Sequence, residues 1–536
     1  MTAQASRTDW LQRYATNYHC WRTIAGTKQT FFKRPHGLTE GWFSWDGDDY
    51  QGRADLTFVF NLEVSHDIGY GQLIRRAILA WANLRLQHVM LMAKITEEGP
   101  DKQRWFVIQK PEGFEEALRD AEMTIGCLKE RDSPLDLTDF LLHASNTGRL
   151  LNSKVSLSKL FVASPERLSQ DKCNMKFAFA MGHEITDGMS AYNWLSHFIR
   201  LLNTSEQILL ENVDKFRTQE QIKSRLPPAQ EDLYLEIPGN KARQLWFWAI
   251  LRVLRHVRKP LPACFVNPLR KETRSSQDFE PKYQDILDYS RDRKPPNNSG
   301  YVLVVLSKLA TDHIKAITRE SGGTIGAACF ALVALSMMEL EEERHPDVRP
   351  ADRKPMIMSF PMNPKPYFGY TKQSESCMLS FGDNFLLPFL PSDLERTGRF
   401  RLLLKQCQIK LSLYQKRIRS PSGKLSLAAY SPSRLLANAS LATNGVSNVG
   451  STRQFFEDVA HQPAKEASND LNARLTFTRG GVRARDGEFL VGSSTDVTGL
   501  LSFGVSYDAS WISDGCVAEW KKKMESLLLP EVTSRL

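Results

Sequence analysis

Hydrophobic positions recur along the chain in two patterns, one typical of strands and one typical of helices. Met175–Met181 is a short, nearly all-apolar run, the pattern of a strand buried on both faces. Leu56–Val64 is rich in residues that favour strands, whereas Gly71–Leu86 and Met189–Leu202 show the apolar spacing of helices. A further strand is expected at Arg104–Ile108. The first part of the chain is therefore predicted to be mixed α/β.

The same two patterns of hydrophobic positions return after residue 300. The expected strands are Tyr301–Leu306, Met356–Phe360, Leu471–Phe477 and Thr498–Tyr507. The expected helices are Ala310–Arg319, Thr324–Met338, Asp393–Gln415 and Gly515–Leu529. The apolar part of the second helix is shorter than the roughly 20 residues that span a bilayer, so it is predicted to be a core helix.

Residues 206–300 show neither the strand pattern nor the helix pattern over most of their length. Proline recurs through a polar, charged stretch that contains one apolar piece, Leu245–Leu254, where a helix is expected. We predict a crossover linker at 206–300 between an N-terminal half, 1–205, and a C-terminal half, 301–536. The fold class is α/β, with two domains built from similar kinds of element.

Composition narrows the class of protein. Hydrophobic residues make up 42% of the chain and charged residues 24%, which is ordinary for a globular protein. Lysine and arginine number 70 against 61 acidic residues, and the surplus gathers between Arg252 and Lys294. Such a surplus suits nucleic acid, a membrane surface or a phosphate-bearing molecule, but a solvated linker is the favoured interpretation. No nucleic-acid-binding motif accompanies it, so nucleic acid is not expected as a partner. No membrane partner is expected either, because no apolar run is long enough to span a bilayer.

The eight cysteines are scattered singly, without a CxxC pair. This spacing favours a reducing compartment and argues against a disulfide framework or a structural metal site. The N-terminal residues Met1–Tyr14 carry charges and lack the apolar run of a signal peptide.

The segment Met181–Ser190 carries the most informative chemistry, because it joins a buried strand to a helix. His183 in such a place can act as a base near neutral pH. A zinc-protease helix would need a second histidine where Asp187 stands, and no GxSxG nucleophile turn is present. The remaining alternative is a hydrogen-bonded core histidine, which the spacing alone favours.

His-x-x-x-Asp-Gly directly after a buried strand, about a third of the way along a two-domain chain, resembles the HxxxD acyltransferase superfamily. That group includes chloramphenicol acetyltransferase, plant BAHD enzymes, fungal trichothecene acetyltransferases and the condensation domains of peptide synthetases. Other pieces follow in the family's order. They are Ser359–Lys365, Gly382-Asp383-Asn384, Val446–Gly450, and Ser502–Tyr507 followed by Trp511–Leu529.

Two departures from the family pattern narrow the resemblance. The plant-type DFGWG sequence is absent, and Ser502–Ser506 is the nearest stretch. The chain thus looks closer to fungal acetyltransferases of the trichothecene 15-O-acetyltransferase kind. Lys365 stands where the family has an arginine, and a lysine cannot make the planar two-pronged contact to a carboxylate.

The resemblance implies two chloramphenicol-acetyltransferase-like mixed-sheet domains with a tunnel between them. It implies an acyltransferase (EC 2.3.1.-) that moves an acyl group, acetyl by default, from coenzyme A to a hydroxyl of a secondary metabolite such as a terpenoid or polyketide. His183 would be the general base of a direct transfer, and Asp187 would hold the loop by an ion pair with Lys365. Gly188 would keep the tunnel open, and Ser447 or Asn448 would stabilise the oxyanion. No metal and no permanently bound cofactor is implied, and acyl-CoA is a co-substrate.

Three expectations stay open at this stage. Arg479, Arg483 and Arg485 could bind the phosphates of coenzyme A, but an exposed hairpin turn around Gly480-Gly481 is the favoured alternative. Ser534-Arg535-Leu536 resembles a peroxisomal address, and the location is otherwise expected to be cytoplasmic. The family's usual form is a monomer. The rival functions are a condensation-type enzyme fed by a carrier protein and a non-catalytic protein that kept the scaffold.

Overall fold

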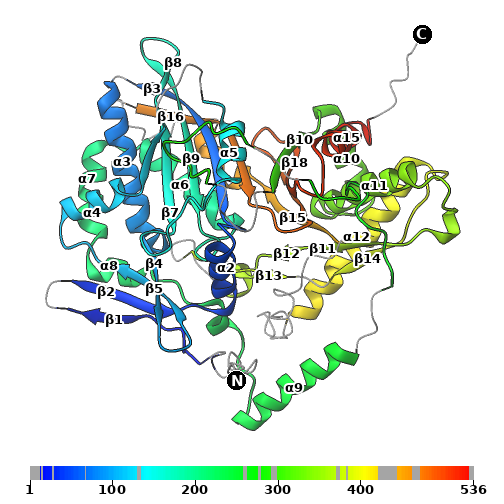
Figure 1. Ribbon diagram of the computed structural model, residues 1–536, viewed down its shortest axis with the longest axis horizontal. Coiled ribbons are helices and arrows are strands. Elements are labelled where there is room, and N and C mark those ends of the chain that lie inside the picture. The colour runs from blue at the N-terminus through cyan, green and yellow to red at the C-terminus, as the bar shows by residue number, and fades with distance from the viewer. Residues whose placement is uncertain are drawn as a thin grey trace.

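The structure is a computed structural model. It describes residues 13, 16–26, 29–66, 68–128, 135–257, 262–275, 279–290, 298–369, 375–381, 384–419, 443–460 and 471–529. Two six-stranded sheets, one for each half, stand side by side with helices packed on them (Figure 1).

The first sheet has the strand order β16-β3-β9-β7-β6, with β8 paired on β9. Its strands are β3 (Leu56–His66), β6 (Ile125–Leu128), β7 (Ser158–Ala163), β8 (Glu166–Arg167), β9 (Lys172–Met181) and β16 (Leu471–Val482). β6 and β7 are parallel, and the other pairs are antiparallel.

The central strand β9 is apolar on both faces because both faces are covered. Phe177 and Phe179 belong to the large core cluster that also holds residues of α3 (Tyr70–Gln87) and α6 (Gly188–Leu202). Ala178 and Ala180 point the other way, into a smaller cluster with α5 (Leu137–Ala144). The alternation of phenylalanine and alanine places the wide space on one face of the sheet and the narrow space on the other.

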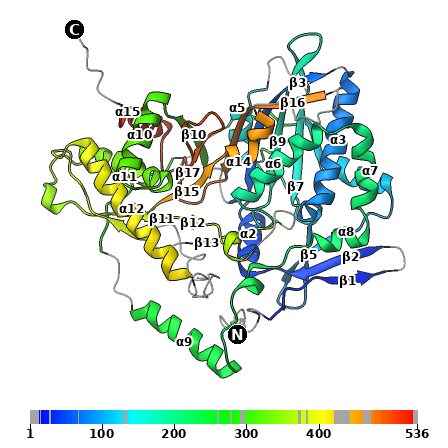
Figure 2. The ribbon, with the colours of Figure 1, turned by 180° about the vertical axis from the view of Figure 1, so that it is seen from behind.

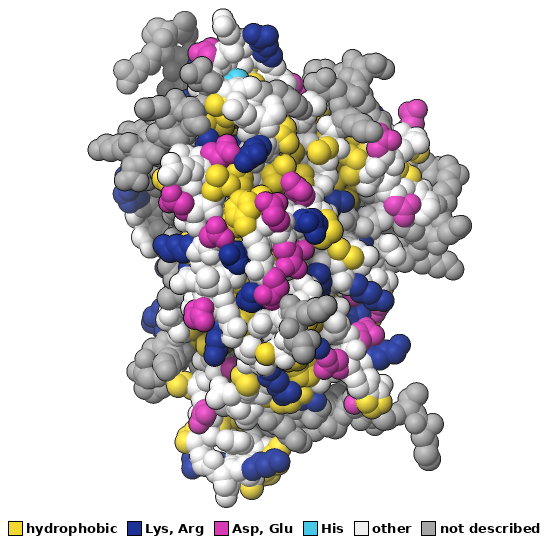
Figure 3. All heavy atoms as spheres, turned by 90° about the vertical axis from the view of Figure 1, so that its left-hand side faces the viewer, with side chains coloured by type: hydrophobic (Ala, Val, Ile, Leu, Met, Phe, Trp, Pro, Cys, Tyr) yellow, Lys and Arg dark blue, Asp and Glu magenta, His cyan; other side chains and the backbone are white. Residues whose placement is uncertain are grey.

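The remaining elements of the first half lie around this sheet. A separate four-stranded sheet has the order β1-β2-β5-β4. Its strands are β1 (Arg22–Ala25), β2 (Thr30–Pro35), β4 (Lys94–Glu98) and β5 (Gln103–Gln109). Further helices are α2 (Leu38–Asp49), α4 (Phe114–Glu122), α7 (Glu206–Phe216) and α8 (Gln219–Ser224). Basic and acidic side chains are interspersed over the side of the molecule on the left of Figure 1 (Figure 3).

The predicted division at residue 205 needs a correction. Leu209 and Val213 of α7 and Ile222 of α8 are fully buried in the core of the first half. The expected linker therefore begins with two helices that complete this core, since α7 packs against α3 and α8 packs against α7.

The second sheet has the order β10-β18-β17-β15-β11-β14. Its strands are β10 (Ser299–Val305), β11 (Met356–Ser359), β14 (Phe385–Leu387), β15 (Thr443–Ser451), β17 (Phe489–Thr495) and β18 (Leu501–Asp508). β15 runs parallel to both β11 and β17, so this sheet is also mixed. β12 (Pro361–Met362) and β13 (Ser380–Phe381) form a short pair of their own. The helices are α10 (Lys308–Glu320), α11 (Ile325–Arg344), α12 (Arg396–Ile418) and α15 (Asp514–Ser526).

One strand crosses between the halves. β16 comes late in the chain but lies at the edge of the first sheet, antiparallel to β3 from Leu471 opposite His66 to Val482 opposite Leu56. The preceding helix, α14 (Arg453–Ala460), buries Phe455 and Phe456 in the core of the first half. The predicted C-terminal half, 301–536, thus contributes a strand and a helix to the N-terminal one (Figure 2).

Helix α9 (Lys241–Val257) stands apart from both sheets in Figures 1 and 2. Among the described residues, no single helix is long and apolar enough to cross a membrane, although α10 and α11 would pass that test as a pair bent by 113°.

Candidate active site

The site is built on the loop between β9 and α6. β9 ends at Met181, and α6 starts at Gly188 with Asp187 as its N-cap. The Asp187 carboxylate accepts a hydrogen bond from the backbone N–H of Ser190 at 3.0 Å. A carboxylate at this position satisfies one of the free N–H groups of the helix end and complements the helix dipole. This cap fixes the loop that carries His183.

Asp187 is also held from the second half of the molecule. Lys365 Nζ lies 2.8 Å from Asp187 Oδ2, and both side chains are buried. Lys365 donates to the Ser190 hydroxyl as well, and the backbone N–H of Met378 donates to Asp187 at 3.2 Å. The ion pair expected between these residues is present, with Lys365 placed just after β12. Its effect is to join the His183 loop to the other half.

His183 lies between an aromatic ring and a thiol. Its imidazole is stacked on Phe43 of α2, with ring centroids 3.8 Å apart and planes 1° from parallel. Its Nδ1 lies 3.9 Å from Cys377 Sγ. The residue is partly exposed, unlike the residues that follow it in the loop. His183 is therefore held in one orientation without being enclosed in the core, which disfavours the alternative of a simple core histidine.

Although part of the residue is exposed, the loss of solvent around its ring sets the charge of this histidine. The pKa of His183 is lowered from 6.5 to about 4, mainly by burial and to a smaller extent by the positive charge of Arg485. Backbone hydrogen bonds and the charge of Asp187 act in the opposite direction but are weaker. The imidazole is therefore neutral at neutral pH, the state that a general base requires.

Sequence reasoning missed the segment Glu375–Leu379, which contacts the other side of this loop. Besides the contacts of Cys377 and Met378, the side chain of Asn193 on α6 donates to Glu375 at 2.9 Å. Burial raises the pKa of the Cys377 thiol well above its usual value, so the thiol stays protonated. No sequence motif marks these residues. Of the family element expected next to them, Gly382 and Asp383 lie outside the described residues, and Asn384 is exposed.

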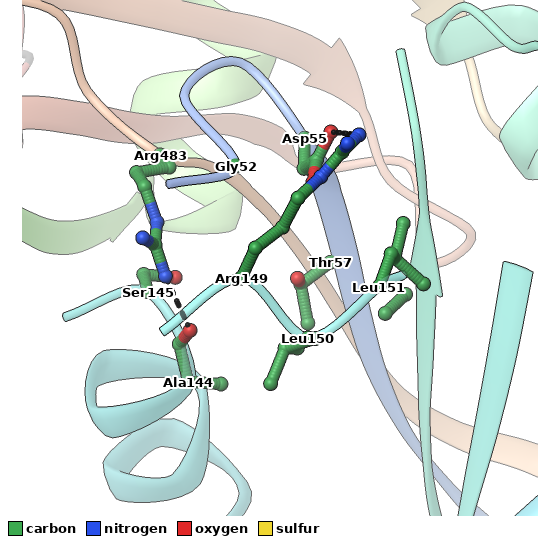
Figure 4. A pocket seen from close by; sticks show the side chains of 10 residues that line it. Gly52, Asp55, Thr57, Ala144, Ser145, Arg149, Leu150, Leu151 and Arg483 are labelled. Carbon is green, nitrogen blue, oxygen red and sulfur yellow. Dashed lines mark hydrogen bonds and ion pairs between the residues drawn. The ribbon is translucent and has the colours of Figure 1, made fainter. Parts of the chain in front are cut away.

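A second group missed from the sequence lies behind the loop. The guanidinium of Arg149 contacts Glu184 Oε1 at 3.0 Å and Asp55 Oδ2 at 2.7 Å, with Asp48 on its third side. Burial raises the pKa of Glu184 to about 7, although Arg149 opposes that shift. Figure 4 shows Arg149 and Asp55 facing one another at the wall of a small pocket. The cluster ties Glu184, the residue after His183, to Asp48 of α2 and to Asp55 just before β3.

The proposed oxyanion donors lie on β15 in the second sheet. Asn448 donates to the Ser493 hydroxyl at 2.9 Å, and its side-chain oxygen accepts from the Gly450 N–H at 3.1 Å. The Ser447 carbonyl accepts a bond of 3.5 Å from the same Ser493 hydroxyl. These contacts are internal to the second half. Gly188, in contrast, faces open space, since a Cβ added there would meet no atom of the described residues within 4 Å.

The arginines 479, 483 and 485 are not grouped at a turn. Gly480 and Gly481 lie inside β16 opposite Phe58 and Thr57, so the favoured hairpin interpretation is wrong. The two glycines leave room for the rings of Phe58 and Tyr301, which an added Cβ would meet at 2.7 and 2.5 Å.

Each arginine already has partners in the protein. Arg479 donates to Thr138 at 3.5 Å, and Arg483 donates to three backbone carbonyls, those of Gln51, Ala144 and Thr147. Arg485 pairs with Asp46 at 2.9 Å and lies over the Trp42 ring. Only Arg485 thereby comes close to the His183 stack, and phosphate binding by the three stays a prediction.

Comparisons with known proteins agree with this architecture. No protein-family model and no curated protein matches the chain. Among solved structures, trichothecene 15-O-acetyltransferase TRI3 from Fusarium sporotrichioides is similar with a TM-score of 0.67 at 12% identity, over 95% of this chain and 96% of that one.

Condensation domains are similar at lower scores. The first condensation domain of the calcium-dependent antibiotic synthetase gives a TM-score of 0.53 at 10% identity, over 92% of this chain and 94% of that one. The condensation domain of the monacolin K polyketide synthase MokA gives 0.50 at 10% identity, over 95% and 99%. The chain has the two-domain fold shared by these acyltransferases and condensation domains, so the fold predicted from the HxxxDG resemblance is confirmed.

Proposed function

We propose that the protein is an acyl-CoA-dependent O-acyltransferase, with His183 as the general base. The observation that carries the proposal is the orientation of His183. Its ring is stacked on Phe43, carries no charge at neutral pH, and stands on a loop that an Asp187–Lys365 ion pair fastens across the two halves. A base fixed where two domains meet can serve two substrates that arrive from different sides.

The reaction proceeds by direct transfer. The acceptor hydroxyl loses its proton to His183 Nε2, the ring nitrogen opposite Cys377, while its oxygen attacks the thioester carbonyl. The tetrahedral intermediate collapses, the carbon–sulfur bond breaks, and the coenzyme A thiolate takes the proton back from the imidazolium. The imidazole ends neutral, and the acyl group has moved from sulfur to oxygen.

The other residues position these groups. Asp187 and Lys365 keep the loop in place and transfer no proton, because both are buried in contact with one another. Gly188 borders the reacting atoms, where its missing side chain leaves space. Ser447 and Asn448 are the proposed oxyanion donors, and Arg485 is the best placed of the three arginines to meet the donor. Losing one oxyanion donor typically costs about 3–4 kcal/mol of barrier.

The acyl group is proposed to be acetyl and the acceptor an alcohol of secondary metabolism, by analogy with the trichothecene acetyltransferase that shares the fold. The fold is equally compatible with a donor thioester held on a carrier protein, as its likeness to condensation domains indicates. The identity of the donor is therefore the first point to test.

The test offers the purified protein acetyl-CoA together with a panel of terpenoid and polyketide alcohols. Thiol release and the acetylated product, identified by mass spectrometry, are followed in parallel. His183→Ala should lower kcat roughly a hundredfold to ten-thousandfold, the usual contribution of a general base. The matched control is His345→Ala, because His345 is an exposed histidine at the end of α11.

Each outcome has a defined meaning. Turnover with free acetyl-CoA that depends on His183 supports the proposal. Turnover only with a carrier-bound thioester would move the protein to the condensation type. Equal activity of His183→Ala and the parent protein with either donor would exclude His183 as the base.

A further inference from the structure

Helix α9 exposes apolar side chains to solvent along its length. Trp246 is 67% exposed, Val253 58% and Ile250 40%, which is high for residues of this kind. The three positions follow the spacing i, i+4, i+7, so they lie on one face of the helix. Phe247 and Leu245 add further exposed apolar surface at 39% and 40%. Figures 1 and 2 agree that the helix lies away from both sheets.

All charged residues of α9 are positive. Lys241–Val257 contains no aspartate or glutamate, and its charged residues are Lys241, Arg243, Arg252 and Arg255. Arg258 and Lys259 follow directly in the sequence. α7 and α15 mix both signs, whereas α12 carries only positive charge like α9 but has no tryptophan. A helix that combines exposed tryptophan with only positive charge is typical of segments that lie in the interface of a membrane.

We propose that α9 binds the surface of an anionic membrane, lying in its plane with Trp246, Ile250 and Val253 in the acyl boundary. The exposed side chains of Lys241 and Arg243 would contact the lipid phosphates. At about 1.5 Å per residue the 17-residue helix is roughly 26 Å long, and its four cations exclude a spanning orientation. This inference is independent of the proposed reaction, and it departs from the expectation of no membrane partner.

Both ends of α9 are tied to the body of the protein. Ile237, just before the helix, packs against the core of the second half, and Phe265 after it is 5% exposed in the same core. Gly239 turns the chain into the helix with a φ of +112°, which a residue with a side chain rarely adopts. Docking of α9 would therefore fix the orientation of the whole molecule on the membrane.

A second copy of the chain is a poorer occupant of this face. In a two-fold contact each patch meets its own copy, so the cations of one α9 would face those of the other. The helix offers no acidic residue to pair with them. An anionic lipid surface supplies the missing negative charge, and this complementarity decides between the two occupants.

The test is co-sedimentation of the full chain with vesicles. One set contains phosphatidylcholine alone, and the other contains phosphatidylcholine and phosphatidylglycerol in a ratio of three to one. Binding to the anionic vesicles should be about tenfold tighter or more, and added salt should weaken it, because several cations contribute. Trp246→Glu combined with Ile250→Glu should abolish binding. Leu402→Glu is the matched control, since Leu402 is 52% exposed on α12 and should leave binding unchanged.

A wild-type protein that stays in the supernatant with both vesicle sets overturns the proposal. So does binding that Trp246→Glu/Ile250→Glu leaves intact. Sedimentation velocity without vesicles tests whether a second copy of the chain covers α9. A dimer that Trp246→Glu/Ile250→Glu dissociates would show that α9 is a dimer interface, and it would overturn the membrane proposal. If the double variant is lost on expression, Arg243→Glu replaces it, because Arg243 is exposed in the first turn and should also weaken vesicle binding.

Discussion

At the scale of single residues, the charge of His183 follows from its neighbours. Burial disfavours the imidazolium, and Arg485 adds a positive charge nearby. Asp187, which is paired with Lys365, favours the charged ring but is outweighed. The ion pair across the halves holds the loop, whereas burial and Arg485 keep the base neutral.

This charge balance gives a prediction for pH. With a pKa of about 4, His183 stays neutral down to about pH 5, so kcat/KM should be level from pH 8 to 5. Activity should be about halved at pH 4 and should fall about tenfold per pH unit below it, as the base becomes protonated. Arg485→Met removes a charge that lowers the pKa of His183, so its acid limb should move to higher pH. An acid limb near pH 6.5 in the parent protein would contradict the assignment, provided that circular dichroism shows it folded there.

The ion pair itself gives a second prediction. Lys365→Met leaves the Asp187 carboxylate buried without its cation, which typically costs about 3–5 kcal/mol of unfolding free energy. Lys308→Met is the control, because Lys308 and Asp312 form an exposed pair that is worth less than about 1 kcal/mol. Urea denaturation of the two variants measures the difference. Equal losses would mean that the pair across the halves does not stabilise the fold.

The residues of the site differ in how far the sequence reveals them. His183, Asp187 and Gly188 could be found because they are close in sequence and follow a recognisable strand. Lys365 could be found only through the family order of elements. Cys377 contacts His183 from 194 residues further along the chain. Arg149 contacts Glu184 from 35 residues before it. No local sequence pattern reveals such long-range contacts, so Cys377 and Arg149 could not be predicted as site residues.

At the scale of elements, β16 shows the same limit. The strand was predicted at Leu471–Phe477, but its place at the edge of the first sheet was not, because periodicity gives a strand's faces and not its partner. The actual strand continues through Gly480 and Gly481, residues that usually weaken a strand. They are tolerated because the rings of Phe58 and Tyr301 fill the space above them.

This packing gives a prediction for Gly481. An alanine Cβ there would lie 2.5 Å from the Tyr301 ring. The ring cannot swing away freely, since its hydroxyl donates to the Val482 carbonyl at 3.0 Å and is hydrogen-bonded to the Ser145 hydroxyl at 2.8 Å. Gly481→Ala should therefore cost about 1–3 kcal/mol, the usual penalty of overpacking. Gly504→Ala on β18, where a Cβ meets nothing within 4 Å, should cost much less.

A double-mutant cycle identifies the cause. Tyr301→Ala removes the ring, so Gly481→Ala should lose most of its effect in that background. Thermal unfolding of the four proteins gives the coupling energy. If the effects of the two substitutions simply add, the clash does not exist.

At the scale of the whole molecule, the exchanged segment makes the halves depend on one another. α14 and β16 bury Phe455, Phe456 and Leu471 in the first core, although they belong to the second half of the chain. Asn203 at the end of α6 accepts from the Ala473 N–H and donates to its carbonyl. Without β16, the edge of β3 would expose its unpaired backbone groups, a common cause of aggregation. The base at the junction thus rests on a structure that neither half forms by itself.

This dependence predicts how the protein unfolds. Two-domain chains often unfold in separate steps, but a shared strand should couple both sheets into one cooperative transition. In calorimetry the ratio of the van't Hoff enthalpy to the calorimetric enthalpy should be close to one. Gly481→Ala, which disturbs only the junction, should lower the midpoint of the whole transition without splitting it. Two resolved transitions in the parent protein would show that each half is stable alone, and that β16 is held by the first sheet without being required by it.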